Sequence, residues 1–274
     1  MLNTKIEMNI KSKNFDFIKD RLPELAVLAD YAESYVHSDP ASCLVKLRSY
    51  TEQTVNIIYK ELNITNPESS TLIDLMQNNS FVESIPKEVL GKLHSLRING
   101  NKAAHGQNIT EDNSKWLLRE AHDVARWMHL SFYGGDISDI NEFQDPEKIE
   151  EGKSKAELAK QEVTIQRLLQ ELEAHRNEAY KQKRSKDHYK QLLNRAKETA
   201  DQLQFNEEQT RLHLIDSLLK SAGWDVKPNK KDSDSVKQEF LVKHQPTSSG
   251  DGYIDYVLWD DETDKPIAVI EAKK

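Results

Sequence analysis

The chain has 274 residues, of which 31% are charged and 37% are hydrophobic, and its mean hydropathy is −0.75. This length suffices for two modest domains, but the composition is too polar for one compact globule of that size. The net charge of −8 excludes a global positive field that would attract nucleic acid, and the single cysteine, Cys43, excludes an internal disulfide framework and a thiolate metal cluster. No run approaches the roughly 20 apolar residues that span a bilayer, and the N-terminus has no apolar signal core, so we expect a soluble cytoplasmic protein without a membrane partner.

Residues 1–145 are expected to form an all-α bundle. Asp39 can cap a helix whose first turn contains Pro40, and this helix should run to about Leu62. Arg48 and Glu52 are spaced to pair on its surface. Its buried stripe is expected at Leu44, Leu47, Thr51, Val55 and Ile58. Further helices are predicted over residues 70–77, 86–97 and 113–132.

A polar segment from Arg97 to Gly106 is predicted to be a loop between two of these helices. Its glycines allow positive φ angles, and Asn101 and His105 are expected to hydrogen-bond the loop and cap the helices. An alternative interpretation gives Arg97 and His105 the role of an RNase pair, since the segment resembles the RNase site of HEPN domains. The seven residues between them exceed the four to six that are usual in that family.

Residues 146–204 form a highly charged segment without proline. A rough heptad of leucine, isoleucine and alanine predicts a long helix, either in a coiled coil between chains or folded back on the bundle. We expect a spacer or docking arm.

Residues 205–274 show a different pattern. An amphipathic helix is predicted over Glu207–Ala222, with Leu218 and Leu219 among its buried residues, and Gly223 ends it. Strands are predicted over Tyr253–Trp259 and Pro266–Ile270, and the second is apolar enough to be buried on both faces.

Two acids and a lysine lie at the ends of these strands. If Trp259 pairs near residue 266 or 267 across the turn, Asp255 falls opposite residue 270 or 271, beside the carboxylate of Glu271. Lys273 is two residues beyond Glu271 and projects from the same face. Two carboxylates without a thiolate or histidine suit Mg²⁺, and the lysine can stabilise charge during phosphodiester hydrolysis.

Several motifs strengthen this interpretation. In identity, order and spacing, they resemble motifs of the nuclease domain of type I restriction enzyme R subunits. They are Glu207-Glu-Gln-Thr-Arg211, Leu214-Ile-Asp216, Ala222-Gly-Trp224, Gly252-Tyr-Ile-Asp255 and Lys265-Pro-Ile-Ala-Val-Ile-Glu271-Ala-Lys273. Lys11-Ser-Lys-Asn-Phe-Asp-Phe17, Asp39-Pro40 and Gly100-Asn-Lys-Ala-Ala-His-Gly106 look like the helical domain of unknown function that precedes that nuclease.

The resemblance implies a fold class, a site and partners. The fold would be α+β, with an N-terminal all-α bundle, a long helical or coiled-coil segment, and an incomplete α/β PD-(D/E)xK restriction-endonuclease-like domain. Asp255 and Glu271 would be the metal ligands and Lys273 the catalytic lysine, with Glu207 or its neighbour Glu208 as a further acid. The cofactor would be Mg²⁺, and the partners would be double-stranded DNA and the modification and specificity subunits of a restriction complex.

The sequence also departs from the family. It has no GxxxxGK[ST] phosphate-binding loop, so ATP would act only through downstream motor domains that the sequence does not contain. We therefore expect the N-terminal fragment of a longer endonuclease, with little nuclease activity by itself. The competing hypothesis is a non-catalytic interaction module, which would be indifferent to metal ions.

Overall fold

The computed structural model divides the chain into two compact units, Met1–Phe205 (unit 1) and Asn206–Lys274 (unit 2). The structure describes residues 11–67, 71–148, 163, 165–174, 185–205, 214–216, 218–220, 222–227, 230–246, 249–260, 263 and 265–271.

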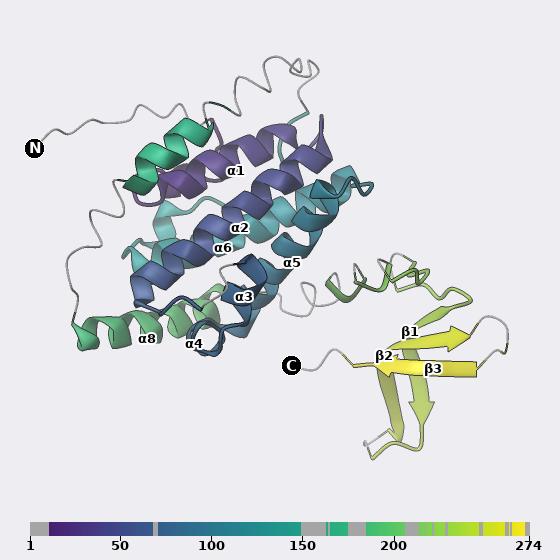
Figure 1. Cartoon of the computed structure of the whole chain (residues 1–274). Coiled ribbons are helices and arrows are strands. Elements are labelled where there is room, and N and C mark those ends of the chain that lie inside the picture. The colour runs from purple at the N-terminus through teal and green to yellow at the C-terminus, as the bar shows by residue number, and fades with distance from the viewer. Residues whose placement is uncertain are drawn as a thin grey trace, which may run out of the picture. The chain divides into compact units, whose positions relative to one another are not determined.

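Unit 1 is a helical bundle in which α1, α2, α5 and α6 pack around one apolar core (Figure 1). Its elements are η1 (Asp16–Ile18), α1 (Pro23–Tyr35), α2 (Pro40–Leu62), α3 (Leu72–Gln77), α4 (Asn79–Ser84), α5 (Lys87–Ala104), α6 (Glu111–Phe132), η2 (Ile137–Asp139) and α8 (Lys186–Leu203).

Helix α2 forms as the sequence predicts. The Asp39 side chain accepts a hydrogen bond from the backbone N–H of Ser42 at 3.1 Å, which satisfies one free donor of the first turn. Arg48 Nη1 lies 2.9 Å from Glu52 Oε1, so the predicted pair is confirmed. The predicted stripe is at most 1% exposed and consists of Leu44, Leu47, Thr51, Val55 and Ile58.

Helix α5 is longer than predicted, because it continues through the expected loop to Ala104. Gly100 lies inside the helix and not in a turn. A Cβ at this position would be 2.5 Å from Cβ of Arg48, so the glycine permits the close approach of α2 and α5. Gly106, with φ +73°, provides the left-handed residue that follows the helix.

The helix predicted over residues 146–204 is not continuous, because residues 165–174 and 186–203 are helical whereas residues 146–148 and Ser185 are not. Residues 140–148 are irregular, and the Asn14 side chain bonds the backbone N–H and carbonyl of Gln144 at 2.8 and 2.9 Å. Ser185 is extended, with ψ 157°, and its side chain accepts the N–H of His188. A serine cap of this kind starts a new helix, α8.

Helix α8 folds back on the bundle. The Trp127 indole N–H donates to the carbonyl of Ala196 at 2.9 Å, and Leu192, Ala196 and Leu203 join the unit 1 core. Of the two predicted forms of the segment, these described residues adopt the folded-back one. A coiled coil between chains stays a prediction.

Unit 2 contains a three-stranded antiparallel sheet in the order β1-β2-β3, formed by β1 (Val236–Lys243), β2 (Asp251–Asp260) and β3 (Lys265–Ile270). Both predicted strands lie within β2 and β3. Helical residues 214–216 and 218–220 belong to the predicted amphipathic helix. Leu219 packs in the unit 2 core with Val226, Val236, Tyr256 and Leu258, whereas Leu218 is 47% exposed, contrary to prediction.

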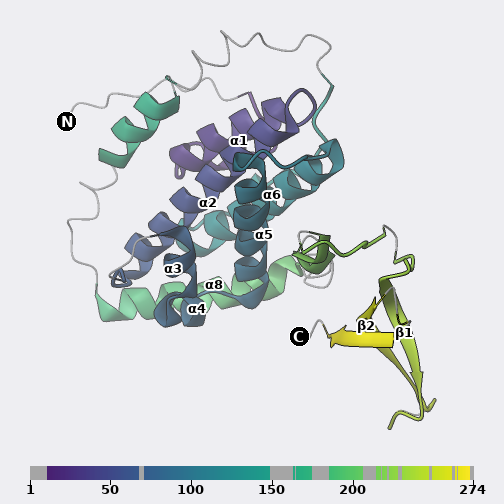
Figure 2. The same cartoon turned by 45° about the vertical axis from the view of Figure 1, so that its right-hand side comes forward.

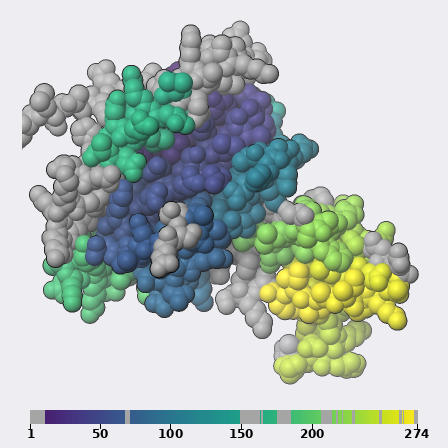
Figure 3. Space-filling model, in the orientation of Figure 1, coloured from purple at the N-terminus to yellow at the C-terminus, as the bar shows by residue number. Residues whose placement is uncertain are grey.

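Strand β3 is not buried on both faces. Ile267 is 60% exposed and Val269 is 58% exposed, and β3 forms much of the face of unit 2 seen in Figure 3. The strand lies at the edge of the described sheet and pairs only with β2 there. An apolar run predicts a buried strand only where further elements cover it.

The described chain is thus α+β, as predicted at this coarse level. The PD-(D/E)xK architecture stays a prediction. Among the described residues, no helix combines the length and apolar character needed to cross a membrane.

Candidate active site

The β2–β3 hairpin brings the predicted metal ligands to neighbouring positions. Trp259 pairs with Pro266, one of the two partners that the sequence predicts, but the register shifts by one residue between Leu258 and Trp259, so the ladder continues to the pair Tyr256 and Ile270. One step further along this antiparallel register, Asp255 lies opposite Glu271. Asp255 is partly buried, and Glu271 is exposed just beyond the end of β3.

The alternation of side chains separates Asp255 from the core. Tyr256 and Leu258 belong to the face that packs against Leu219 of the helix. Because neighbouring side chains of a strand project from opposite faces, Asp255 projects from the other face of the sheet. The candidate ligands therefore lie away from the small core.

Tyr256 connects the helix to the sheet beside the candidate site. Its hydroxyl donates a hydrogen bond to Oδ1 of Asp216 at 2.7 Å. Burial raises the pKa of Tyr256, and the nearby negative charges of Asp216, Asp255 and Glu239 raise it further. Tyr256 thus stays a neutral donor, and the carboxylate charge of Asp255 is within electrostatic reach of it.

Glu239 is a third acid of this region that the sequence did not indicate. The register places Gln238 opposite Tyr256 and Phe240 opposite Ile254, so Glu239 lies across from Asp255 on β1. Its φ of +49° is in the left-handed region, which disfavours a side chain, and its carboxylate pairs with Lys230. The sequence feature that could have pointed to Glu239 is its position directly before the apolar residues Phe240–Val242 of β1.

Two of the predicted site residues, Glu207 and Lys273, lie outside the described residues. Within the described part, no three His, Cys, Asp or Glu side chains are arranged to hold a metal ion. The pair formed by Asp255 and Glu271 supplies two carboxylates in adjacent positions, and this donor set suits a hard cation such as Mg²⁺.

The alternative RNase pair is not brought together. Arg97 and His105 are eight residues apart on one helical path, a separation of about 12 Å along the axis. Arg97 is partly buried near Arg48 of α2, whereas His105 is exposed at the C-cap of α5. The separation arises because the segment is a helix and not the loop that would let the two side chains converge.

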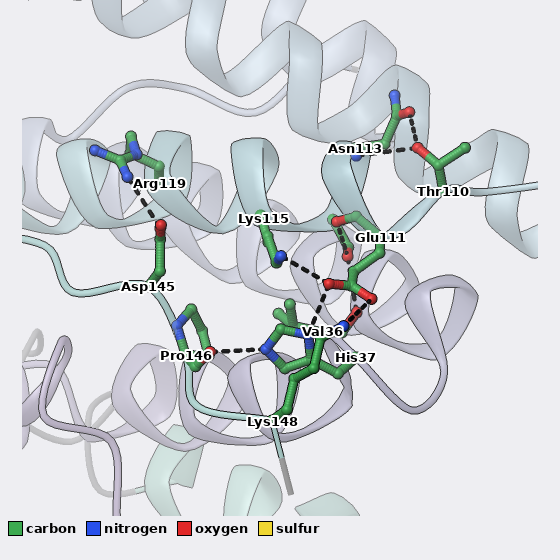
Figure 4. Close-up of polar contacts among 11 residues, drawn as sticks. Val36, His37, Thr110, Glu111, Asn113, Lys115, Arg119, Asp145, Pro146 and Lys148 are labelled. Atoms are coloured by element: carbon green, nitrogen blue, oxygen red, sulfur yellow. Dashed lines mark hydrogen bonds and ion pairs between the residues drawn. The ribbon is translucent and has the colours of Figure 1, made fainter.

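A polar cluster joins the start of α6 to the turn between α1 and α2 (Figure 4). Glu111 lies 3.0 Å from Nδ1 of His37 and 2.7 Å from Nζ of Lys115. These contacts lower the pKa of Glu111 to about 2, and the hydrogen bond from Lys115 has the largest effect. His37 also contacts the carbonyl of Pro146 through Nε2 at 2.7 Å. The cluster holds the irregular segment after α6, and its charges are mutually paired, so we assign it a structural role.

Comparisons with known proteins agree with the resemblance seen in the sequence motifs. Residues 30–133 match the family described as "Domain of unknown function (DUF4145)". The chain is 24% identical to the type I restriction enzyme EcoKI endonuclease subunit of Escherichia coli (strain K12), over an alignment 326 positions long that covers 97% of this chain and 27% of that protein. No solved structure matches. The chain is therefore similar, over nearly all of its length, to about a quarter of a type I restriction endonuclease subunit.

Proposed function

We propose that this chain carries the nuclease site of a type I restriction endonuclease subunit, with Asp255 and Glu271 as the metal ligands. The adjacency of these two carboxylates across the β2–β3 register carries the proposal. Its support from outside the structure is the similarity to the EcoKI subunit. The full protein would cleave double-stranded DNA together with modification and specificity subunits, after ATP-driven translocation.

In the proposed reaction, each residue has a separate task. Asp255 and Glu271 would hold Mg²⁺ through their oxygens. The bound ion supplies a Lewis acid for the phosphoryl oxygen and lowers the pKa of a bound water. Lys273 would place an ammonium beside the attacked phosphate and stabilise the negative charge that develops there. Glu207 would add a further acid from the helix.

Metal binding by the intact 274-residue chain tests the ligands. Electron paramagnetic resonance of free Mn²⁺ counts the ions that the chain takes up. We expect Asp255→Asn and Glu271→Gln each to weaken binding at least about tenfold, since each removes one of two charged ligands. Asp251→Asn is the matched control, because Asp251 lies four residues away on the same strand and therefore on the same face.

Equal Mn²⁺ uptake by the wild type and both ligand variants would contradict the proposal and favour the non-catalytic interaction module. Lys273→Ala separates the tasks further. It should leave Mn²⁺ uptake unchanged and abolish Mg²⁺-dependent nicking of a supercoiled plasmid, however weak that nicking is in the wild type.

A further inference from the structure

Helices α2 and α5 lie side by side in unit 1 (Figures 1 and 2). Arg48 of α2 and Arg97 of α5 are close enough to repel each other electrostatically. At Gly100 an added Cβ would lie 2.5 Å from Cβ of Arg48 and 3.0 Å from the carbonyl of Leu44, so the two backbones approach closely. The Arg48 side chain passes this contact, and its Nε donates to Oδ1 of Asn101 at 2.7 Å. Arg97 lies one turn before Asn101 on α5 and therefore on the same face.

Arg97 has no hydrogen-bond or ion-pair partner in the described part of the chain. Its Nε is buried without an acceptor. Burial lowers the pKa of Arg97, and the positive charge of Arg48 lowers it further. A guanidinium that is partly desolvated, unpaired and repelled by a second guanidinium is unfavourable in the folded protein alone.

The other charged groups near this pair do not neutralise it. Glu52 is already engaged by Arg48, with Oε1 2.9 Å from Nη1. His94 lies one turn before Arg97, and burial together with the charge of Arg97 lowers its pKa to about 4, so it is uncharged at neutral pH. Two guanidinium groups thus face one carboxylate, which leaves a local excess of positive charge on a chain of net charge −8.

From this arrangement we propose that Arg97 and Arg48 form a binding site for a phosphate group on the α2–α5 face of unit 1. Phosphate oxygens would accept hydrogen bonds from the Arg97 guanidinium, whose side chain is partly exposed and whose planar group of N–H donors suits the geometry of phosphate. Asn101 positions Arg48 for this role. The site belongs to unit 1 and the proposed nuclease residues belong to unit 2, and the inference does not depend on the nuclease function.

Thermal unfolding of the full chain in inorganic phosphate tests the site, with sodium chloride of equal ionic strength as the reference. Phosphate should raise the Tm of the wild type, because a ligand that binds only the folded state stabilises it. Arg97→Gln should weaken phosphate binding about tenfold or more and remove this rise. Arg119→Gln removes the same charge from an exposed position on α6 and should keep the rise.

The Tm without phosphate separates a binding role from a structural one. Because Arg97 is unpaired and repelled by Arg48, Arg97→Gln should leave the phosphate-free Tm unchanged or higher. The proposal is overturned if phosphate does not raise the Tm of the wild type, or if it raises the Tm of Arg97→Gln equally.

A measurement on the wild type does not depend on the variant folding. The Nε–Hε NMR signal of Arg97 should shift saturably with phosphate, and an unchanged signal would also overturn the site. Short single-stranded DNA with and without a 5′-phosphate then identifies the source of the group. Tighter binding of the phosphorylated strand assigns a terminal phosphate, and equal binding assigns a backbone diester.

Discussion

The ammonium group of Lys92 is buried in unit 1 between two acids of α6. Its side chain is 2% exposed, and Nζ lies 3.2 Å from Glu120 and 2.8 Å from Asp123. The Phe205 ring covers the same ammonium at 5.0 Å. The Lys92 charge therefore compensates the buried carboxylate of Glu120, whose side chain is 7% exposed.

Lys92→Met should lower the free energy of unfolding by about 3–5 kcal/mol, because it leaves an uncompensated buried charge. Urea denaturation measures this change. Lys19→Met is the control, because Lys19 pairs with Asp16 at the surface, where an ion pair is worth about 1 kcal/mol or less. Similar losses in the two variants would contradict the prediction, and adding Glu120→Leu to Lys92→Met should recover part of the stability.

His122 is expected to make unit 1 sensitive to acid. The ring is 2% exposed and makes edge contacts with Phe15, Phe17 and Phe143. Burial lowers the pKa of His122 to about 4. The unfolded chain has a histidine pKa of about 6.5, so between pH 6.5 and pH 4 the unfolded state binds more protons than the folded state.

The stability from neutral His122 is therefore complete above pH 6.5 and is lost as the pH falls toward 4. The full loss of unfolding free energy is about 3 kcal/mol. Urea denaturation at pH 7, 6 and 5 measures how steeply the free energy of unfolding falls with pH. His122→Phe should reduce the slope while keeping the aromatic contacts. An identical slope in the variant would show that His122 does not contribute.

At the scale of elements, the α2–α5 contact depends on Gly100. Gly100→Ala places a methyl group where Arg48 Cβ and the Leu44 carbonyl already lie within 3.0 Å. Although alanine favours helix, the overpacked contact should cost about 1–3 kcal/mol of unfolding free energy. Gly106→Ala is a useful comparison. The space around Gly106 is open, so the loss of stability in this variant arises only from the φ of +73°. Gain of stability in Gly100→Ala would contradict the close packing.

At the scale of the whole molecule, the two units differ greatly in core size. The core of unit 1 includes residues of α1 to α6 and of α8, whereas the described core of unit 2 has five buried apolar residues. Small cores stabilise a fold only marginally. We therefore expect two unfolding transitions, with unit 2 unfolding first.

Two tyrosine variants assign the transitions. Tyr256→Phe removes the hydrogen bond to Asp216 and should lower only the first transition, by about 1 kcal/mol. Tyr50→Phe removes the hydrogen bond to the Ala121 carbonyl, at 3.1 Å, and should lower only the second. Calorimetry or urea denaturation followed by NMR distinguishes them, and one transition that responds to both variants would contradict the prediction.

The sequence by itself determined the features that depend on neighbours along the chain. The start of α2 was predictable because Asp39 caps its own helix and Pro40 fits the first turn. The register of the β2–β3 hairpin was predictable to within one residue, because a short connection limits the possible pairings. The sequence left residues 270 and 271 as alternatives opposite Asp255, and the register shift between Leu258 and Trp259 favours Glu271. The roles of Asp255, Glu271, Glu207 and Lys273 stay predictions.

Only the tertiary structure decided the features that depend on distant neighbours. The polar segment around Gly100 is typical of a loop, but packing against α2 favours helix there and separates Arg97 from His105. β3 is apolar enough for a core, yet its exposure depends on which elements lie beside it. The burial of Lys92 and the meeting of Arg48 with Arg97 likewise join residues of different helices, and a side-chain pattern along one helix carries no information about the partner that it will face.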